Sequence, residues 1–156
     1  MIHFFDEVKL AHKLKNNEVS SKEKFGYFII QTLIIYFTYY GLYYGTPTFI
    51  ISIELMICSV IGIITMYICY RINSKGDDDK FIERFTCLSL PILLRVTVLS
   101  IILYLVGLFL DQRIKDLAGS LSLDPEVLKS IASELIINIS MLNLYINSFR
   151  IISKKA

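Results

Sequence analysis

Charged residues are scarce in this sequence. Asp, Glu, Lys and Arg make up 19% of its 156 residues, and the formal net charge is only +2. Soluble domains usually contain about 25% charged residues, and proteins that bind nucleic acid usually carry a strongly basic patch or stripe. The composition therefore argues against a soluble domain, and we expect no nucleic-acid partner.

Cysteine is also rare, with only Cys58, Cys69 and Cys87, which lie within or at the edge of apolar segments. They show no Cys-x-x-Cys spacing and have no histidine nearby in sequence, so neither a zinc site nor a disulfide framework is indicated. Cysteine commonly acts as a small, polarizable packing residue in apolar surroundings. We expect that role here, with acylation of Cys69 or Cys87 as the alternative.

Motifs of familiar catalytic chemistry are missing as well. The sequence has no Gly-rich phosphate loop, no H-E-x-x-H and no G-x-S-x-G. Its two histidines, His3 and His12, lie in the N-terminal segment, away from the carboxylates of the apolar segments. We therefore expect a protein that is not an enzyme and that holds no metal and no cofactor.

Apolar residues, in contrast, are abundant and grouped. They make up 54% of the sequence, and the mean hydropathy is +0.58. They form blocks of about 20 residues, the length that an α-helix needs to cross a bilayer core of ~30 Å. A soluble all-helical domain is the alternative, but four such blocks leave too little polar surface to cover them. The predicted transmembrane spans are 25–44, 48–70, 81–110 and 131–152.

These spans predict an all-α fold, an integral membrane four-helix bundle over residues 20–156. Residues 1–19 precede it as a cytoplasmic segment with a short amphipathic helix, which either lies on the membrane surface or packs on the bundle. Because the first 24 residues lack an apolar core, we expect no cleavable signal peptide. The third and fourth helices are longer than the bilayer is thick, so they should form an extended hairpin that projects from it.

The orientation follows from the distribution of Lys and Arg. The N-terminal segment, the loop after the second span and the C-terminal end together hold twelve of these residues, and the other two connections hold three. Positive residues accumulate on the cytoplasmic side of membrane proteins. Both termini are therefore predicted to be cytoplasmic.

Arg95 is the charge that lies deepest in an apolar block, near the middle of the third span. An arginine inside a bilayer is costly unless other groups or water stabilise it. Pro91 lies one helical turn earlier and cannot donate a hydrogen bond to the carbonyl of Cys87, so a helix kink is expected there. The exposed carbonyl would lie close to the arginine.

Other polar residues of the spans offer partners for this arginine. Asn143 and Asn147 share one face of the fourth span, with Asn143 at about the depth of Arg95, and Glu134 and Asn138 line the opposite face. These groups would form a structural interior network, line a water-filled path, or face another membrane protein. The predicted intramembrane polar network consists of Glu54, Arg95, Glu134, Asn138, Asn143 and Asn147.

One short segment resembles known sequences. Asp79-Lys80-Phe81-x-x-Arg84-Phe85-x-x-Leu88-Ser89, followed by Arg95, resembles a segment in families of small, functionally uncharacterised bacterial inner-membrane proteins. The resemblance covers 17 residues. It implies a bacterial or phage-type location in the cell inner membrane and implies nothing about activity.

The leading functional hypothesis is a non-enzymatic multi-pass membrane protein that acts through helix association in the lipid bilayer. It would be an accessory or regulatory subunit of a membrane protein partner, or a homo-oligomer. The alternative is a pore-forming channel or small transporter with Arg95 and Glu54 in its pathway. A further alternative is a membrane-active toxin or holin-like protein.

Overall fold

The computed structural model describes residues 5–43, 48–76, 80–120 and 124–153, without the side chains of 37–43 and 48–54. All secondary structure in these ranges is helical, which confirms the predicted all-α class. The helices are α1 (Glu7–Lys15), α2 (Ser21–Tyr43), α3 (Thr48–Lys75), α4 (Phe81–Phe109), α5 (Asp111–Ser120) and α6 (Pro125–Ser153).

The helix starts follow signals that are visible in the sequence. Ser20 and Glu23 form a capping box at the start of α2, in which the backbone N–H of Glu23 donates to Ser20 Oγ at 3.3 Å and the backbone N–H of Ser20 donates to Glu23 Oε2 at 3.1 Å. At the start of α6, Asp124 Oδ1 accepts from the backbone N–H of Glu126 at 2.8 Å, and Pro125 is the first helical residue. Local sequence therefore fixes where both long helices begin.

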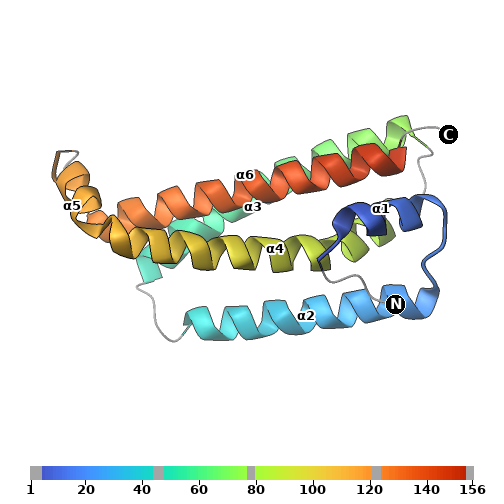
Figure 1. The fold of residues 1–156 in the computed structure, drawn as a ribbon, viewed down its shortest axis with the longest axis horizontal. Coiled ribbons are helices and arrows are strands. Elements are labelled where there is room, and N and C mark those ends of the chain that lie inside the picture. The colour runs from blue at the N-terminus through green and yellow to red at the C-terminus, as the bar shows by residue number, and fades with distance from the viewer. Residues whose placement is uncertain (1–4, 44–47, 77–79, 121–123, 154–156) are drawn as a thin grey trace.

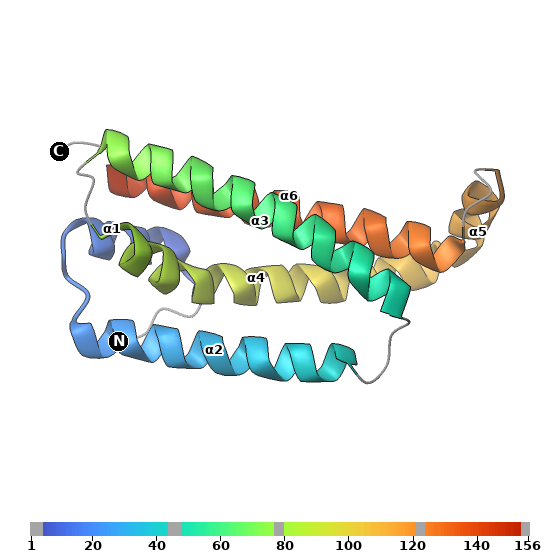
Figure 2. The ribbon, with the colours of Figure 1, turned by 180° about the vertical axis from the view of Figure 1, so that it is seen from behind.

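The four long helices lie side by side along the long axis of the molecule (Figure 1). α3 packs along α6, α4 packs on α6, and α2 packs on α4. The view from behind places α2 at one edge of this array and the pair α3 and α6 at the other (Figure 2). The predicted array of long helices is thus present, whereas its closure into a four-helix bundle stays a prediction.

Three of these helices are long and apolar enough to cross a membrane, namely Leu55–Lys75, Phe81–Phe109 and Pro125–Ser153. They correspond to the second, third and fourth predicted spans. The predicted first span coincides with α2, but part of α2 has no described side chains, so its role as a span stays a prediction. The fourth long helix, α6, starts at Pro125, six residues before the predicted span.

The hairpin between α4 and α6 is broken. The third and fourth helices were expected to form an extended hairpin, but α4 ends at Phe109 and α5 turns away from its axis (Figure 1). Asp111 stabilises this corner through ion pairs with Lys115 at 2.6 Å and Lys129 at 3.7 Å. The hydrogen bond from Lys115 lowers the pKa of Asp111, and the same bond raises the pKa of Lys115.

The tightly packed core lies at the end of the molecule that holds α1, which we call the α1 end. Side chains of α1, α3, α4 and α6 are fully buried there, and the aromatic rings of Phe85 and Tyr145 stack with centroids 4.6 Å apart. The core includes Leu10, Ala11, Leu14, Cys69, Cys87, Leu88, Leu90, Ile92, Phe149 and Ile152. At the opposite end, which we call the α5 end, large apolar side chains are mostly exposed.

Candidate functional site

Arg95 makes its contacts with the N-terminal segment. Its Nη1 lies 2.6 Å from Glu7 Oε1, while Nε and Nη2 both donate to the backbone carbonyl of Phe5, at 3.2 and 3.0 Å. A carboxylate and a carbonyl oxygen thus stabilise the guanidinium together. Charge-assisted hydrogen bonds of this kind are about twice as strong as neutral ones.

The packing of α1 explains why Glu7 reaches the arginine. Leu10, Ala11 and Leu14 are buried where α1 packs on α4 and α6, and Glu7 lies one helical turn earlier on the same face. The Glu7 side chain is only 4% exposed, whereas the Arg95 side chain is 45% exposed. Of the two alternatives for the N-terminal helix, the structure therefore has the one in which it packs on the membrane helices.

The structure does not bring Asn143 and Asn147 to Arg95. Both asparagines are exposed on the face of α6 that turns away from the core. Arg95 instead faces α1, whose carboxylate is a stronger partner for a guanidinium than a neutral amide. The sequence carried one signal for this contact, an acidic residue on the apolar face of an amphipathic helix.

Glu134 and Asn138 are brought together, as their shared face predicted. The Asn138 amide is buried and donates to the side-chain Oε1 of Glu134 at 2.6 Å and to its backbone carbonyl at 2.9 Å. Both residues belong to α6, so this contact is local. The side chain of Glu54, the other predicted acidic member of the network, lies outside the described residues.

Arg84 is a buried arginine, although the count of Lys and Arg that predicted the orientation included it in the loop after the second span. It lies in the first turn of α4, is 2% exposed, and donates from Nη1 to Asn73 Oδ1 at 3.0 Å. Asn73, near the end of α3, is buried as well. The basic loop predicted after the second span therefore has one exposed cation fewer than the sequence count assumed.

A second buried polar contact joins α4 and α6. The hydroxyl of Tyr145 donates to Ser89 Oγ at 2.7 Å, and Ser89 donates in turn to the carbonyl of Phe85 at 2.8 Å. No contact was predicted for Tyr145 or Ser89, because the sequence does not show which faces of two helices meet. The contact fixes the relative level of the two helices.

Pro91 lies inside α4 and is fully buried. The helix continues through it without a break from Phe81 to Phe109. The helix therefore tolerates the loss of the hydrogen bond that proline cannot donate. A kink of its axis stays a prediction.

The cysteines divide into two buried thiols and one exposed thiol. Cys69 and Cys87 are buried in the core at the α1 end, as packing residues are, whereas Cys58 is exposed. Among the residues that the structure describes, no group of three or more His, Cys, Asp or Glu side chains could hold a metal ion.

The chemistry available at Arg95 is that of a half-exposed cation. A guanidinium has five N–H donors, and the contacts with Glu7 and Phe5 use three of them. The other two can donate to further oxygen atoms. Such a group can bind an anion or a carbonyl oxygen beside α1.

Comparisons with known proteins add no relative. No protein-family model matches the chain, and neither the curated proteins nor the solved structures contain a match. The resemblance of the segment 79–95 to bacterial inner-membrane proteins therefore stays a prediction.

Proposed function

We propose that this chain is a non-enzymatic multi-pass membrane protein that acts through helix association, and that it forms a homo-oligomer through the α5 end of its spans. The proposal rests on the apolar side chains of α3 and α4 that stay exposed towards the α5 end. An accessory role beside another membrane protein would use the same surface.

The observation that supports the proposed oligomer most directly is one face of α3. Thr65, Cys69 and Asn73 follow one another at helical spacing and are buried at the α1 end. Cys58 and Gly62 continue the same face towards the α5 end. There Cys58 is exposed, and a Cβ added at Gly62 would meet no atom within 4 Å.

Helix α4, which packs on α6, also exposes apolar side chains over the half towards the α5 end. Between Val98 and Phe109 its large apolar side chains are exposed on several sides of the helix, with Phe109 90% exposed. These residues are Val98, Ile101, Ile102, Tyr104, Leu105, Val106, Leu108 and Phe109. Over this half, α4 is covered on the face of the buried Gly107, which lies against Lys129 of α6, and is exposed on its other faces.

Helix association in a bilayer depends on close packing, because lipid tails are as apolar as leucine side chains. Small residues such as glycine let two helix backbones approach and gain dispersion contacts. The open stretch at Cys58 and Gly62 offers this kind of surface to a helix of a second copy.

We further propose that the protein lies in the cell inner membrane with both termini cytoplasmic, so that the α1 end faces the cytoplasm. The distribution of Lys and Arg supports this orientation. The exposed face of α6 changes from Leu135, Ile136 and Ile139 to Asn143 and Arg150 towards the α1 end, which supports a boundary of the membrane at this end.

Native cysteines provide a direct test of association. In membranes, a variant that keeps only Cys58 (Cys69→Ala, Cys87→Ala) is expected to form a disulfide-linked dimer upon oxidation. The matched variant that keeps only the buried Cys69 should stay monomeric. Native mass spectrometry in mild detergent should show an oligomer for the unmodified chain.

Gly62→Leu tests the surface itself, because a leucine would hold the two helices apart. We expect this variant to be monomeric while keeping its helical circular dichroism. A strictly monomeric unmodified chain contradicts the proposal, and an oligomer that Gly62→Leu leaves intact rules out this face of α3.

A further inference from the structure

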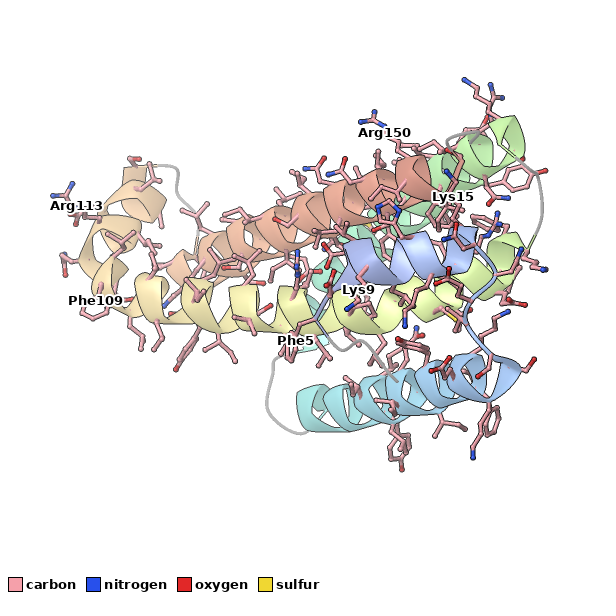
Figure 3. All side chains as sticks on the ribbon, turned by 45° about the vertical axis from the view of Figure 1, so that its right-hand side comes forward. Phe5, Lys9, Lys15, Phe109, Arg113 and Arg150 are labelled. Atoms are coloured by element: carbon pink, nitrogen blue, oxygen red, sulfur yellow. The ribbon has the colours of Figure 1, made fainter. Side chains whose placement is uncertain are left out.

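α1 carries a basic face that points away from the protein. Lys9 and His12 are exposed, and Lys13 and Lys15 are half-buried. Figure 3 shows the labelled Lys9 and Lys15 at the surface of α1, and Arg150 at the surface of the adjacent α6. Helix α1 therefore presents a row of cations along the side of the molecule.

Within α1 itself the one acidic residue is Glu7, which is buried and paired with Arg95. Asp6 and Glu18 flank the helix and are exposed; Asp6 caps α1 by accepting from the backbone N–H of Lys9 at 2.9 Å, and Glu18 accepts from the side-chain amide of Asn16 at 3.1 Å. The exposed positions of α1 therefore carry cations and no carboxylate. Arg95 adds a half-exposed guanidinium with two remaining N–H donors at the end of α1 where Glu7 lies. The face is therefore complementary to an anion.

The apolar side of α1 is already used by the protein. An amphipathic helix that binds a membrane surface normally buries its apolar face among the lipids and keeps its charged face in water. In this chain Leu10, Ala11 and Leu14 pack on α4 and α6 instead. Its basic face, and not its apolar face, is what α1 offers to its surroundings.

The depth of α1 places these cations at the boundary of the bilayer. The contact between Ser89 and Tyr145 sets the level of α4 against α6. The exposed face of α6 changes from Ile139 to Asn143 close to this level. Arg95 lies six residues further along α4 towards the α5 end than Ser89, or ~9 Å at 1.5 Å per residue. α1 thus stands beside the transition from apolar to polar surface, where lipid headgroups lie.

We propose that the basic face of α1, together with Arg95, is a binding site for the headgroup phosphate of an anionic phospholipid. The lysines attract the negative charge, and the free N–H groups of Arg95 donate to phosphate oxygens. Each basic residue near an anionic membrane surface strengthens binding about fivefold. This site does not depend on oligomer formation and lies at the opposite end of the molecule from the proposed association surface.

The test uses the full chain in mild detergent with phosphatidylglycerol, phosphatidylcholine or inorganic phosphate, and native mass spectrometry counts the retained ligand. We expect phosphatidylglycerol to be retained at least about tenfold better than phosphatidylcholine. The variant Lys9→Gln, Lys13→Gln, Lys15→Gln should lose this preference.

The matched control removes the same charge from other exposed positions at the α1 end, with Lys22→Gln, Arg71→Gln and Lys75→Gln. It should keep the preference for phosphatidylglycerol. Equal retention of the two lipids by the unmodified chain overturns the proposal, and so does an equal loss in both triple variants, which would indicate net charge alone. Inorganic phosphate that displaces the lipid at millimolar concentration would show a site for free phosphate and also overturns it.

Discussion

Glu7 and Arg95 are 88 positions apart in the sequence, yet Glu7 Oε1 lies 2.6 Å from Arg95 Nη1. The pair ties the N-terminal helix to the third predicted span. Because α1 also buries Leu10, Ala11 and Leu14 against α4 and α6, the N-terminal segment is part of the folded unit. The deepest cation of the sequence is thus stabilised by the segment that the sequence analysis had placed outside the bilayer.

Removing one member of this pair should destabilise the protein. Glu7→Gln leaves Arg95 without its anionic partner, and truncating one member of a buried ion pair costs about 3–5 kcal/mol. Because the arginine is half-exposed, we expect a smaller loss, about 1–3 kcal/mol, seen as a lower Tm in mild detergent by circular dichroism. Arg95→Glu should lower the Tm at least as much.

The control for this prediction is the charge reversal. Combining Glu7→Arg with Arg95→Glu restores opposite charges at the same two positions, so the double variant should be more stable than either single variant. Single and double variants with additive losses would show that the two side chains do not interact.

Asn73 should contribute more to the stability of the protein than an exposed asparagine does. Its Oδ1 accepts from Arg84 Nη1 at 3.0 Å, and both residues are buried. Asn73→Ala removes an acceptor from a buried guanidinium, and a lost hydrogen bond to a charged group costs about 1.5–3 kcal/mol. The Tm measured in mild detergent should fall accordingly.

Asn143→Ala is the matched control, because Asn143 is exposed on α6. We expect its unfolding free energy to change by less than about 0.5 kcal/mol. Equal effects of the two substitutions would mean that the contact between Asn73 and Arg84 contributes nothing to stability.

The helices and their starts were predictable because their signals are local. Apolar blocks indicated the long helices, and Ser20 with Glu23 and Asp124 with Pro125 indicated the starts of α2 and α6. The break after Phe109 was missed, since Ile114 and Leu117 continue the apolar pattern into α5, while the contact that accompanies the change of direction, between Asp111 and Lys129 of α6, is not local.

The polar contacts were harder to predict because they are not local. Glu134 and Asn138 lie one turn apart on a single helix, and their place on one shared face followed from spacing alone. The partner of Arg95, in contrast, depends on how α1 folds back onto α4. Sequence periodicity gives the faces of each helix but not which faces meet.

Gly76 provides a test of the close approach between the ends of α3 and α6. A Cβ at this position would lie 2.9 Å from both Cα and Cβ of Ser153, so an alanine forces the two helix ends apart. Overpacking of this kind typically costs about 1–3 kcal/mol, and the Tm of Gly76→Ala in mild detergent should fall. Gly119→Ala in α5 is the matched control, because its Cβ would meet nothing within 4 Å and alanine favours a helix by up to about 1 kcal/mol. A Gly76→Ala variant as stable as Gly119→Ala would show that the ends of α3 and α6 do not meet at Ser153. The parallel alignment of α3 along α6 would then be wrong.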